Sequence, residues 1–397
     1  MNSPLRCAIR SAAVLLALLA IWAGPARAAR EVRRHFPFIR PLLMGDAYVA
    51  VADEASAVFY NPAALALGQD NAYEAFNPQI IVNSLVDALL TNPDQVAAQY
   101  QNLDAATFQS LLGTRLYSQI DLRMPFITLA RKNLAFGLGI EFLANAEVMG
   151  NPVIPSLHLE FHADAIAFVT MATQVTERMA VGITPKAIYR KGLDRVFTFG
   201  ELFAAGATAD ISSNPDFIAL TDKSYLEYGL DLGLVYRLPF WPGWQPRIGV
   251  SMLNVGSYTS EKGLGGVVFG QRPTPYDPPL GGELQQLNSI GFAVSPTYFG
   301  MRLTLAFDLV DVTQTVLPGS DWLKRTRLGG EIGVGVRDDG SSLFSLLGGL
   351  NGTHASFGML SRIWFMEVGL GSYEVELGEN AGDHAERFTV LLFGFRF

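Results

Sequence analysis

The chain has 397 residues, a formal net charge of −8, 49% hydrophobic residues and a mean hydropathy of +0.24. The acidic balance argues against nucleic acid as a partner, because nucleic-acid binding needs basic patches. After the N-terminal leader, no stretch reaches the ~18 uninterrupted apolar residues of a membrane-spanning helix. This leaves two fold classes: a large soluble core, or a transmembrane β-barrel with apolar residues at every second position.

The N-terminus has the parts of a secretory signal peptide: a basic start, an apolar run over 12–23 and an Ala-x-Ala motif at 26–28. We predict a signal peptide over residues 1–28, cleaved after its last alanine, in preference to an uncleaved anchor. The single cysteine, Cys7, would leave with it. The mature chain is therefore expected to have no disulfide and no cysteine metal site, which suits an oxidising destination.

The next segment, 42–67, sets small and polar residues in a distinctive order: Gly45-Asp46-Ala47, then Ala52-Asp53 with Ala55-Ser56, then Tyr60-Asn61-Pro62-Ala63. This order resembles the N-terminal segment of the FadL-like family of outer-membrane transporters for hydrophobic compounds, and of the related PorV-like barrels. The resemblance is sharp over roughly a tenth of the chain and general elsewhere. It implies a barrel of about fourteen strands with an N-terminal hatch inside the lumen.

Carried over residue by residue, the resemblance predicts a hatch over residues 29–70 that gates substrate through Gly45, Asp46, Asp53, Tyr60, Asn61, Pro62 and Ala63. Small residues allow backbone to pack within a narrow lumen. An asparagine before a proline is biased away from helix and favours a turn. The alternative is that these residues only shape a plug and contact no ligand.

Period-two alternation predicts that residues 71–397 form the barrel. In 226–237, leucines and tyrosines occupy one face, while Glu227, Asp231 and several glycines occupy the other. Strands of ten or more residues are long enough to cross a bilayer when tilted. We expect fourteen strands, near 73–82, 117–129, 134–146, 158–172, 180–190, 225–237, 246–256, 288–298, 301–311, 325–337, 343–350, 354–361, 363–377 and 385–397.

The links between these strands alternate in length, with short ones such as 131–133, 299–300 and Arg362. Short periplasmic turns and long surface loops are typical of outer-membrane barrels, so both termini are expected on the periplasmic side. The long link 83–116 has apolar residues at helical spacing and is predicted to be a partly helical surface loop. The first strand is the weakest, because Pro78 lies within it.

The inward faces carry basic residues that are candidates for binding the carboxylate of an amphipathic substrate: Lys186, Arg190, Arg237, Arg302 and Arg327. The structural alternative, which the sequence favours, is that acidic residues of the wall balance them. Those acidic residues are Asp121, Glu141, Asp231, Asp308, Glu331 and Glu367.

Other patterns give little support to metal, nucleotide or catalytic sites. His158 and His162 flank Glu160 on one strand face, but four residues of strand separate the histidines by roughly 13 Å, too far to share one ion. The glycines at 329–335 are not followed by a helix, so they do not form a phosphate loop. No nucleophile elbow is present. We therefore expect no metal, no cofactor and no enzymatic activity.

The chain ends in an alternating strand with a terminal aromatic residue, Phe397, which resembles the signal read by the barrel-assembly machinery. The prediction is thus a bacterial outer-membrane barrel for passive uptake of hydrophobic small molecules such as long-chain fatty acids or hydrocarbons. The alternative is a PorV-like barrel that docks an envelope secretion, attachment or conjugation apparatus. The expected partners are membrane lipid, the hydrophobic ligand and the assembly machinery.

Overall fold

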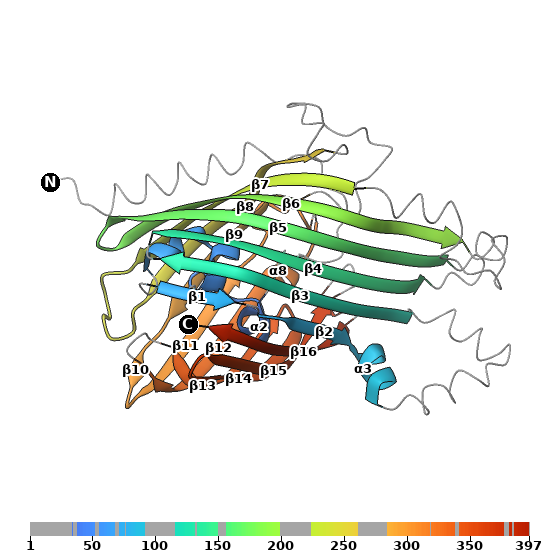
Figure 1. Cartoon of the computed structure of the whole chain (residues 1–397). Helices are drawn as coiled ribbons and strands as arrows, with labels where there is room; N and C mark the ends of the chain where they lie inside the picture. Colours follow the sequence, from blue (N-terminus) through green and yellow to red (C-terminus); the bar gives the residue numbers. More distant parts are fainter. Residues whose placement is uncertain are drawn as a thin grey trace.

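The computed structural model describes residues 34, 38–51, 55–67, 71–75, 77–91, 116–131, 133–149, 156–198, 224–260, 284–317, 319–337, 341–376, 381–382 and 385–396. Within these residues, antiparallel strands form one closed β-barrel (Figure 1). The barrel has 14 strands when β1 and β2 count as one interrupted strand, and β9 and β10 as another.

The strands follow one another around the barrel in chain order. Their bounds are β1 Asn71–Ala75, β2 Gln79–Asn83, β3 Leu116–Arg131, β4 Leu134–Met149, β5 Ser156–Thr176, β6 Met179–Thr198, β7 Ser224–Arg237, β8 Arg247–Ser260, β9 Leu287–Val294, β10 Thr297–Tyr298, β11 Met301–Leu309, β12 Thr326–Val336, β13 Ser342–Asn351, β14 His354–Ile363, β15 Met366–Glu376 and β16 Ala385–Arg396.

The barrel closes at the interrupted first strand. Both β1 and β2 pair with β16 on one side and with β3 on the other. Closure leaves no row of unpaired backbone groups, which is the condition for a sheet in hydrocarbon.

The two faces of the strands differ as the alternation predicts. In β4, Leu134, Phe136 and Leu138 are exposed on the outer face, whereas Ala135 and Glu141 are buried on the inner face. The same outward row of large apolar side chains continues around the sheet, with members such as Leu305, Leu328, Leu346, Val368 and Leu391. An apolar exterior around a closed antiparallel sheet is the architecture of an outer-membrane protein, and the chain is one.

The two ends of the barrel are joined differently. At one end the links between strands are 132–133, 177–178, 238–246, 299–300, 337–341 and 364–365. At the other end they are 84–115, 150–155, 199–223, 261–286, 310–325, 352–353 and 377–384. The start of β1 and the end of β16 both lie at the short-link end, which agrees with the predicted alternation.

Several expected bounds were wrong in detail. The first strand is broken between β1 and β2, because Pro78 cannot donate a ladder hydrogen bond. The strand expected at 288–298 is likewise split into β9 and β10. Arg362 lies within β14, and the turn falls at 364–365. Strands β5 and β6 are longer than expected, because they continue to pair with each other from Ser156 and Thr198 at one end to Thr176 and Met179 at the other.

Short helices accompany the barrel: α2 (Ile39–Leu43), the 3-10 turns η1 (Ala55–Phe59) and η2 (Pro62–Leu67), α3 (Ser84–Thr91) and α8 (Trp322–Arg325). Helix α3 lies within the link expected to be partly helical, of which 92–115 are outside the described residues. No helix in the described residues is long and apolar enough to cross a membrane.

Candidate functional site

The candidate site is the barrel interior together with the segment that fills it, here called the inner segment (residues 38–51 and 55–67). Helix α2 contacts β13 to β16, whereas η2 contacts β5 to β7. The segment therefore bridges opposite walls. Figure 1 shows α2 among the strands of the barrel. Its side chains Leu43, Tyr48 and Val58 are fully buried and belong to the main apolar cluster.

Asn61, Pro62 and Ala63 lie against β6 and β7. The Asn61 amide donates to the carbonyl of Val49, at 2.9 Å, and to that of Leu234 in β7, at 3.1 Å. The side-chain carbonyl oxygen of Asn61 accepts the N–H of Ala63 at 3.2 Å. One side chain thus joins two parts of the inner segment to the wall, in addition to forming the turn expected before a proline.

Two wall glycines make room for this turn. A Cβ on Gly182 would overlap the backbone of Pro62, and a Cβ on Gly233 would overlap the Asn61 side chain. The inward glycines, which the sequence shows only as a crowded face, therefore allow the backbone of the inner segment to approach the strands closely.

Gly45 and Asp46 lie against β12 and β13. Both have a left-handed backbone, with φ of 62° and 64°. A Cβ on Gly45 would lie 2.6 Å from the Leu328 carbonyl oxygen and from the Leu350 amide nitrogen, so only glycine fits. The Asp46 carboxylate pairs with Arg34 at 3.0 Å. Asp53, the remaining acidic residue expected in the hatch, lies outside the described residues.

Arg34 and Tyr60 form a buried cation–aromatic pair. The guanidinium carbon lies 4.6 Å from the Tyr60 ring centroid, and this ring meets Tyr48 edge to face at 5.2 Å. Burial lowers the pKa of Arg34, but nearby acidic groups, Asp46 first, outweigh burial and raise it overall. Burial raises the pKa of Tyr60 well above its usual value, and Asp46 adds to this. At neutral pH, Arg34 is therefore a cation that lies over the uncharged phenol ring of Tyr60.

Two further contacts fix the inner segment and were not singled out from the sequence. Arg40 is 2% exposed and donates to one oxygen of Glu331, at 3.0 and 2.5 Å, and to the Tyr48 hydroxyl at 2.9 Å. Asp308 accepts the N–H groups of Tyr48 and Val49 at 2.6 and 2.8 Å. Glu331 and Asp308 were expected only as neutralising wall charges. No pattern in the sequence pairs them with residues some 260 to 291 positions away.

The candidate lumen cations differ in their partners and in their exposure. Lys186 pairs with Asp231 at 2.9 Å, and Arg190 binds both oxygens of Asp164 at 2.8 and 2.6 Å. Arg237 is exposed at the short-link end, where it donates to the Leu67 carbonyl at 3.3 Å. These three thus have partners within the protein.

The other two cations lie near the ends of strands. Arg302 stands near the start of β11 on the inward side and is partly buried. Arg327 is buried near the start of β12 and donates to the carbonyls of Lys324 and Thr326 at 2.6 and 3.1 Å.

The histidine cluster on β5 faces the lumen. His162 is buried between two carboxylates of its own strand, with Nδ1 3.7 Å from Glu160 and Nε2 3.8 Å from Asp164. Within the described residues, no group of three or more His, Cys, Asp and Glu side chains is arranged to hold a metal ion.

The long-link end of the barrel is partly covered from within. The link 310–325 folds back so that Val316 and Leu317 pack on Leu253 and Leu287 of the inner wall. The Asp311 carboxylate holds this fold by accepting backbone N–H groups of the same link, among them that of Leu317 at 2.6 Å.

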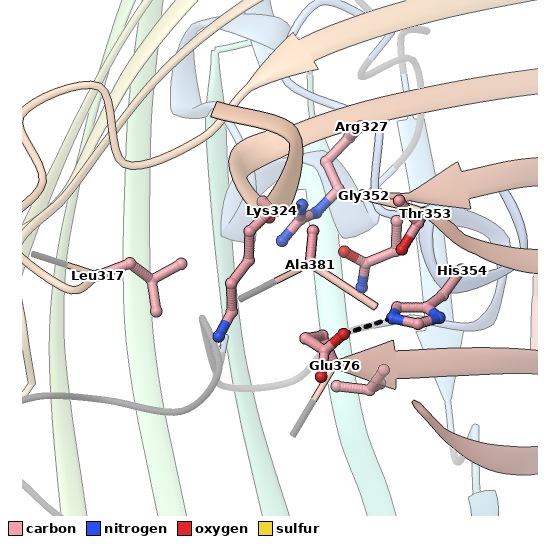
Figure 2. A pocket seen from close by; sticks show the side chains of 10 residues that line it. Leu317, Lys324, Arg327, Gly352, Thr353, His354, Glu376 and Ala381 are labelled. Atoms are coloured by element: carbon pink, nitrogen blue, oxygen red, sulfur yellow. Dashed lines mark hydrogen bonds and ion pairs between the residues drawn. The ribbon is translucent and has the colours of Figure 1, made fainter. Parts of the chain in front are cut away.

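A small pocket lies beside this covering link (Figure 2). Its lining includes the buried cations Lys324 and Arg327. It also includes His354, whose Nε2 lies 2.8 Å from Glu376. A second small pocket lies between α2 and the break in the first strand and is lined by Arg40, Asn77 and Gln79 among others. Neither pocket is lined by Asn61 or Pro62.

No model of a protein family matches the sequence, and no curated protein matches it. Among solved structures, the Pseudomonas putida toluene transporter TodX is similar at 10% identity, covering 93% of this chain and 100% of that chain with a TM-score of 0.44. The Ralstonia pickettii toluene transporter TbuX is similar at 12% identity, covering 90% of this chain and 97% of that chain with a TM-score of 0.43. A Pseudomonas aeruginosa FadL homologue is similar at 11% identity, covering 93% of this chain and 99% of that chain with a TM-score of 0.33.

The FadL-like family, which residues 42–67 resemble, is thus represented among the similar structures. So are barrels of other kinds, such as the translocator domain of the Neisseria meningitidis autotransporter NalP, at 9% identity and a TM-score of 0.34. At such identities the similarity concerns the general architecture.

Proposed function

We propose that this barrel carries hydrophobic small molecules passively across the outer membrane, with the inner segment as its gate. The observation that carries the proposal is that residues 38–51 and 55–67 are largely buried and contact strands on opposite sides of the barrel. The inner segment contributes no strand to the wall and is held by side-chain packing and by polar contacts such as those of Asn61, Arg40 and Asp308. An element held in this way can shift while the closed sheet stays intact. The printed names of TodX and TbuX, toluene transporters, agree with a hydrophobic substrate.

The route begins at the pocket of Figure 2, at the long-link end. Lys324 and Arg327 there offer positive charge at buried positions, where a carboxylate is bound more strongly than in water. The next residue, Leu328, contacts Gly45 of the inner segment. A carboxylate headgroup that reaches these cations would therefore lie close to the gate. The two cations favour a substrate with such a headgroup, a long-chain fatty acid, over a neutral hydrocarbon.

Uptake assays test the proposal directly. Radiolabelled oleate and toluene are supplied to cells that carry or lack the gene, and accumulation is followed with time. We expect the gene to accelerate oleate uptake. Equal uptake of every compound with and without the gene would overturn the transport function.

Substitutions in the pocket test the substrate class. Lys324→Met together with Arg327→Met should slow oleate uptake several-fold. The matched control is Arg387→Met, which removes a cation whose side chain is exposed and pairs with Glu374 at 2.6 Å. Equal loss of oleate uptake in both variants would contradict a specific headgroup site.

Cysteine labelling tests the movement of the gate. Ala63 in the inner segment and Ala306 on the inner wall are both buried. Ala63→Cys should react with a periplasmic maleimide faster when oleate is present, whereas Ala306→Cys should not. If Ala63→Cys stays unreactive while oleate is taken up, the ligand leaves by another path. The break between β1 and β2 is then the first place to examine.

The second candidate is a PorV-like docking barrel with a sealed lumen. The observation that favours it is the dense packing of the inner segment, with Tyr48 and Tyr60 fully buried and charged pairs on opposite walls. Purification from native membranes discriminates between the two. A stoichiometric envelope partner, with no lipid or hydrocarbon in the lumen and no gene-dependent uptake, would favour docking.

A further inference from the structure

The first part of the link after β11 reaches from one wall of the barrel towards another, and its residues 310–317 are here called the lid. Leu317 packs in a small apolar cluster with Leu253 of β8 and Leu287 of β9, separate from the main cluster. The same side chain lines the pocket of Figure 2, to which Val375 of β15 also contributes. Strands β11 to β14 lie between β9 and β15 in the sheet, so the lid crosses part of the lumen.

One carboxylate holds the lid in its folded shape. Asp311 is fully buried, and its two oxygens accept the N–H groups of Thr315, Val316 and Leu317 at 2.9, 3.1 and 2.6 Å. Successive backbone N–H groups that point at one anion form a nest, and hydrogen bonds to a charged acceptor are stronger than neutral ones. The lid is therefore a compact unit that can move without changing its own shape.

The backbone of the lid is left-handed where it begins and just beyond where it ends. The φ angles are 49° for Asp311, 54° for Gln314 and 71° for Gly319, which has open space around its Cα. Residues with a side chain are disfavoured in this region. The hydrogen bonds to the Asp311 carboxylate offset this cost, so the folded lid depends on that carboxylate.

The hydrogen bonds of the lid to the barrel wall lie on the side of β9. The N–H of Val312 donates to the carbonyl of Asn288 at 2.8 Å, and the Asn288 amide donates to the Thr313 hydroxyl at 2.8 Å. Among the described residues, no hydrogen bond joins 311–317 to β13, β14 or β15. On that side the apolar side chain of Leu317 faces the pocket. The lid can therefore lift from the pocket while it stays attached at β9.

We propose that the lid closes the long-link mouth over the buried cations Lys324 and Arg327, and that Asp311 keeps it closed. A ligand that arrives from the long-link end reaches these cations when Leu317 moves away from Val375. The identity of the ligand, a fatty-acid carboxylate, rests on the proposed function. The movement of the lid does not rest on it and is measured without a ligand.

Thiol labelling of the purified barrel tests the movement. Cys7, the only cysteine of the chain, lies in the predicted signal peptide, so an introduced cysteine reports alone. Val375 is buried in the lining of the pocket, and Val375→Cys should react slowly with a membrane-impermeant maleimide. Asp311→Ala should make this reaction several-fold faster. Asp311→Asn keeps one of the two acceptor oxygens and should give an intermediate rate.

The matched control is Ala306→Cys, at another buried position of the inner wall, which reports loosening of the whole barrel. Its labelling rate should not change when Asp311→Ala is added. An unchanged rate for Val375→Cys in the presence of Asp311→Ala would overturn the lid. Equal acceleration at both positions would overturn it as well, because Asp311 would then stabilise the barrel as a whole.

A crosslink tests whether the closed lid limits access of the ligand. Dibromobimane becomes fluorescent when it joins two nearby thiols, and it should join Leu317→Cys to Leu253→Cys. The joined protein should bind a dansyl-labelled fatty acid several-fold more slowly than the unreacted protein. The matched control is Thr170→Cys with Thr184→Cys, whose parent hydroxyls lie 2.8 Å apart on neighbouring wall strands. Joining this pair should leave the binding rate unchanged.

The two assays separate failure of the lid from failure of the proposed function. Equal binding rates with and without the crosslink between lid and wall would overturn the role of the lid in ligand access. If no variant binds the fatty acid while labelling of Val375→Cys still depends on Asp311, the proposed function is contradicted and the lid is supported.

Discussion

Glycines on the inner wall determine where the inner segment can approach the strands closely. Several of them remove a side chain where the inner segment approaches, as Gly182 does for Pro62 and Gly249 does for Val49. The same residue type serves a different purpose in the turns, where Gly243 has open space around its Cα. The consequence of a substitution therefore depends on what each glycine faces.

Gly182→Ala is expected to destabilise the folded barrel by about 1–3 kcal/mol, because an added methyl group must displace the backbone of Pro62. Gly243→Ala should stay within about 0.5 kcal/mol of the parent. Urea unfolding in detergent, followed by tryptophan emission, measures both. Equal stability of the two variants would mean that the inner segment does not press on β6.

The pair of Arg40 and Glu331 gives a second prediction at this scale. Arg40→Met leaves a buried carboxylate without its cation and should cost about 3–5 kcal/mol. Adding Glu331→Gln should recover much of the loss, because the uncompensated charge is then gone. The double-mutant cycle is measured by the same unfolding assay. A double variant as unstable as the sum of the two single variants would show that the two residues act independently.

At the scale of elements, the ends of the chain complete the barrel. Strand β16 pairs with β15 over its whole length and with both pieces of the first strand. The ladder therefore cannot close until β16 has been made. The predicted recognition of the C-terminal strand by the assembly machinery concerns Phe397, which lies outside the described residues.

Phe397→Ala should lower the amount of folded barrel in outer membranes several-fold while leaving the stability of the folded fraction unchanged, if the terminal ring serves recognition. Phe393→Ala, on the outer face of the same strand, is the matched control. Membrane fractions are compared by heat-modifiable mobility on gels. Equal amounts of folded Phe397→Ala and parent protein would exclude a recognition role for this residue.

At the scale of the whole molecule, the outer face of the barrel determines which solvent the protein needs. A barrel whose exterior carries Leu138, Leu346 and Val368 at exposed positions would associate non-specifically in water. In a bilayer the same face contacts the hydrocarbon chains of the lipids, and the polar backbone groups of the strands are paired with one another.

Leu138→Lys provides the test of this solvent assignment. A lysine at the bilayer midplane of a β-barrel costs about 2–4 kcal/mol, so the variant should be destabilised in vesicles by up to that amount. In a soluble protein the same substitution at an exposed site would change little. Asn133→Lys, at an exposed turn, is the control and should be neutral. Equal stability of both variants in vesicles would contradict a lipid-facing outer surface.

Local periodicity by itself determined the barrel. Alternation in β4 and β7 decides which side chains meet lipid, and the lengths of the links decide which end of the barrel is which. Both are local properties, so the predicted strands agree with the observed ones to within a few residues over most of the sheet. The exceptions, the break at Pro78 and the longer β5 and β6, arise where a ladder hydrogen bond is missing or where two neighbouring strands continue to pair with each other.

Only the tertiary structure decided what fills the lumen and what each charge there contacts. Arg40 meets Glu331, and Asp308 meets the backbone of Tyr48, across 291 and 260 positions of the chain. Such partners depend on how the inner segment is threaded through the closed sheet, and no periodic pattern encodes that path.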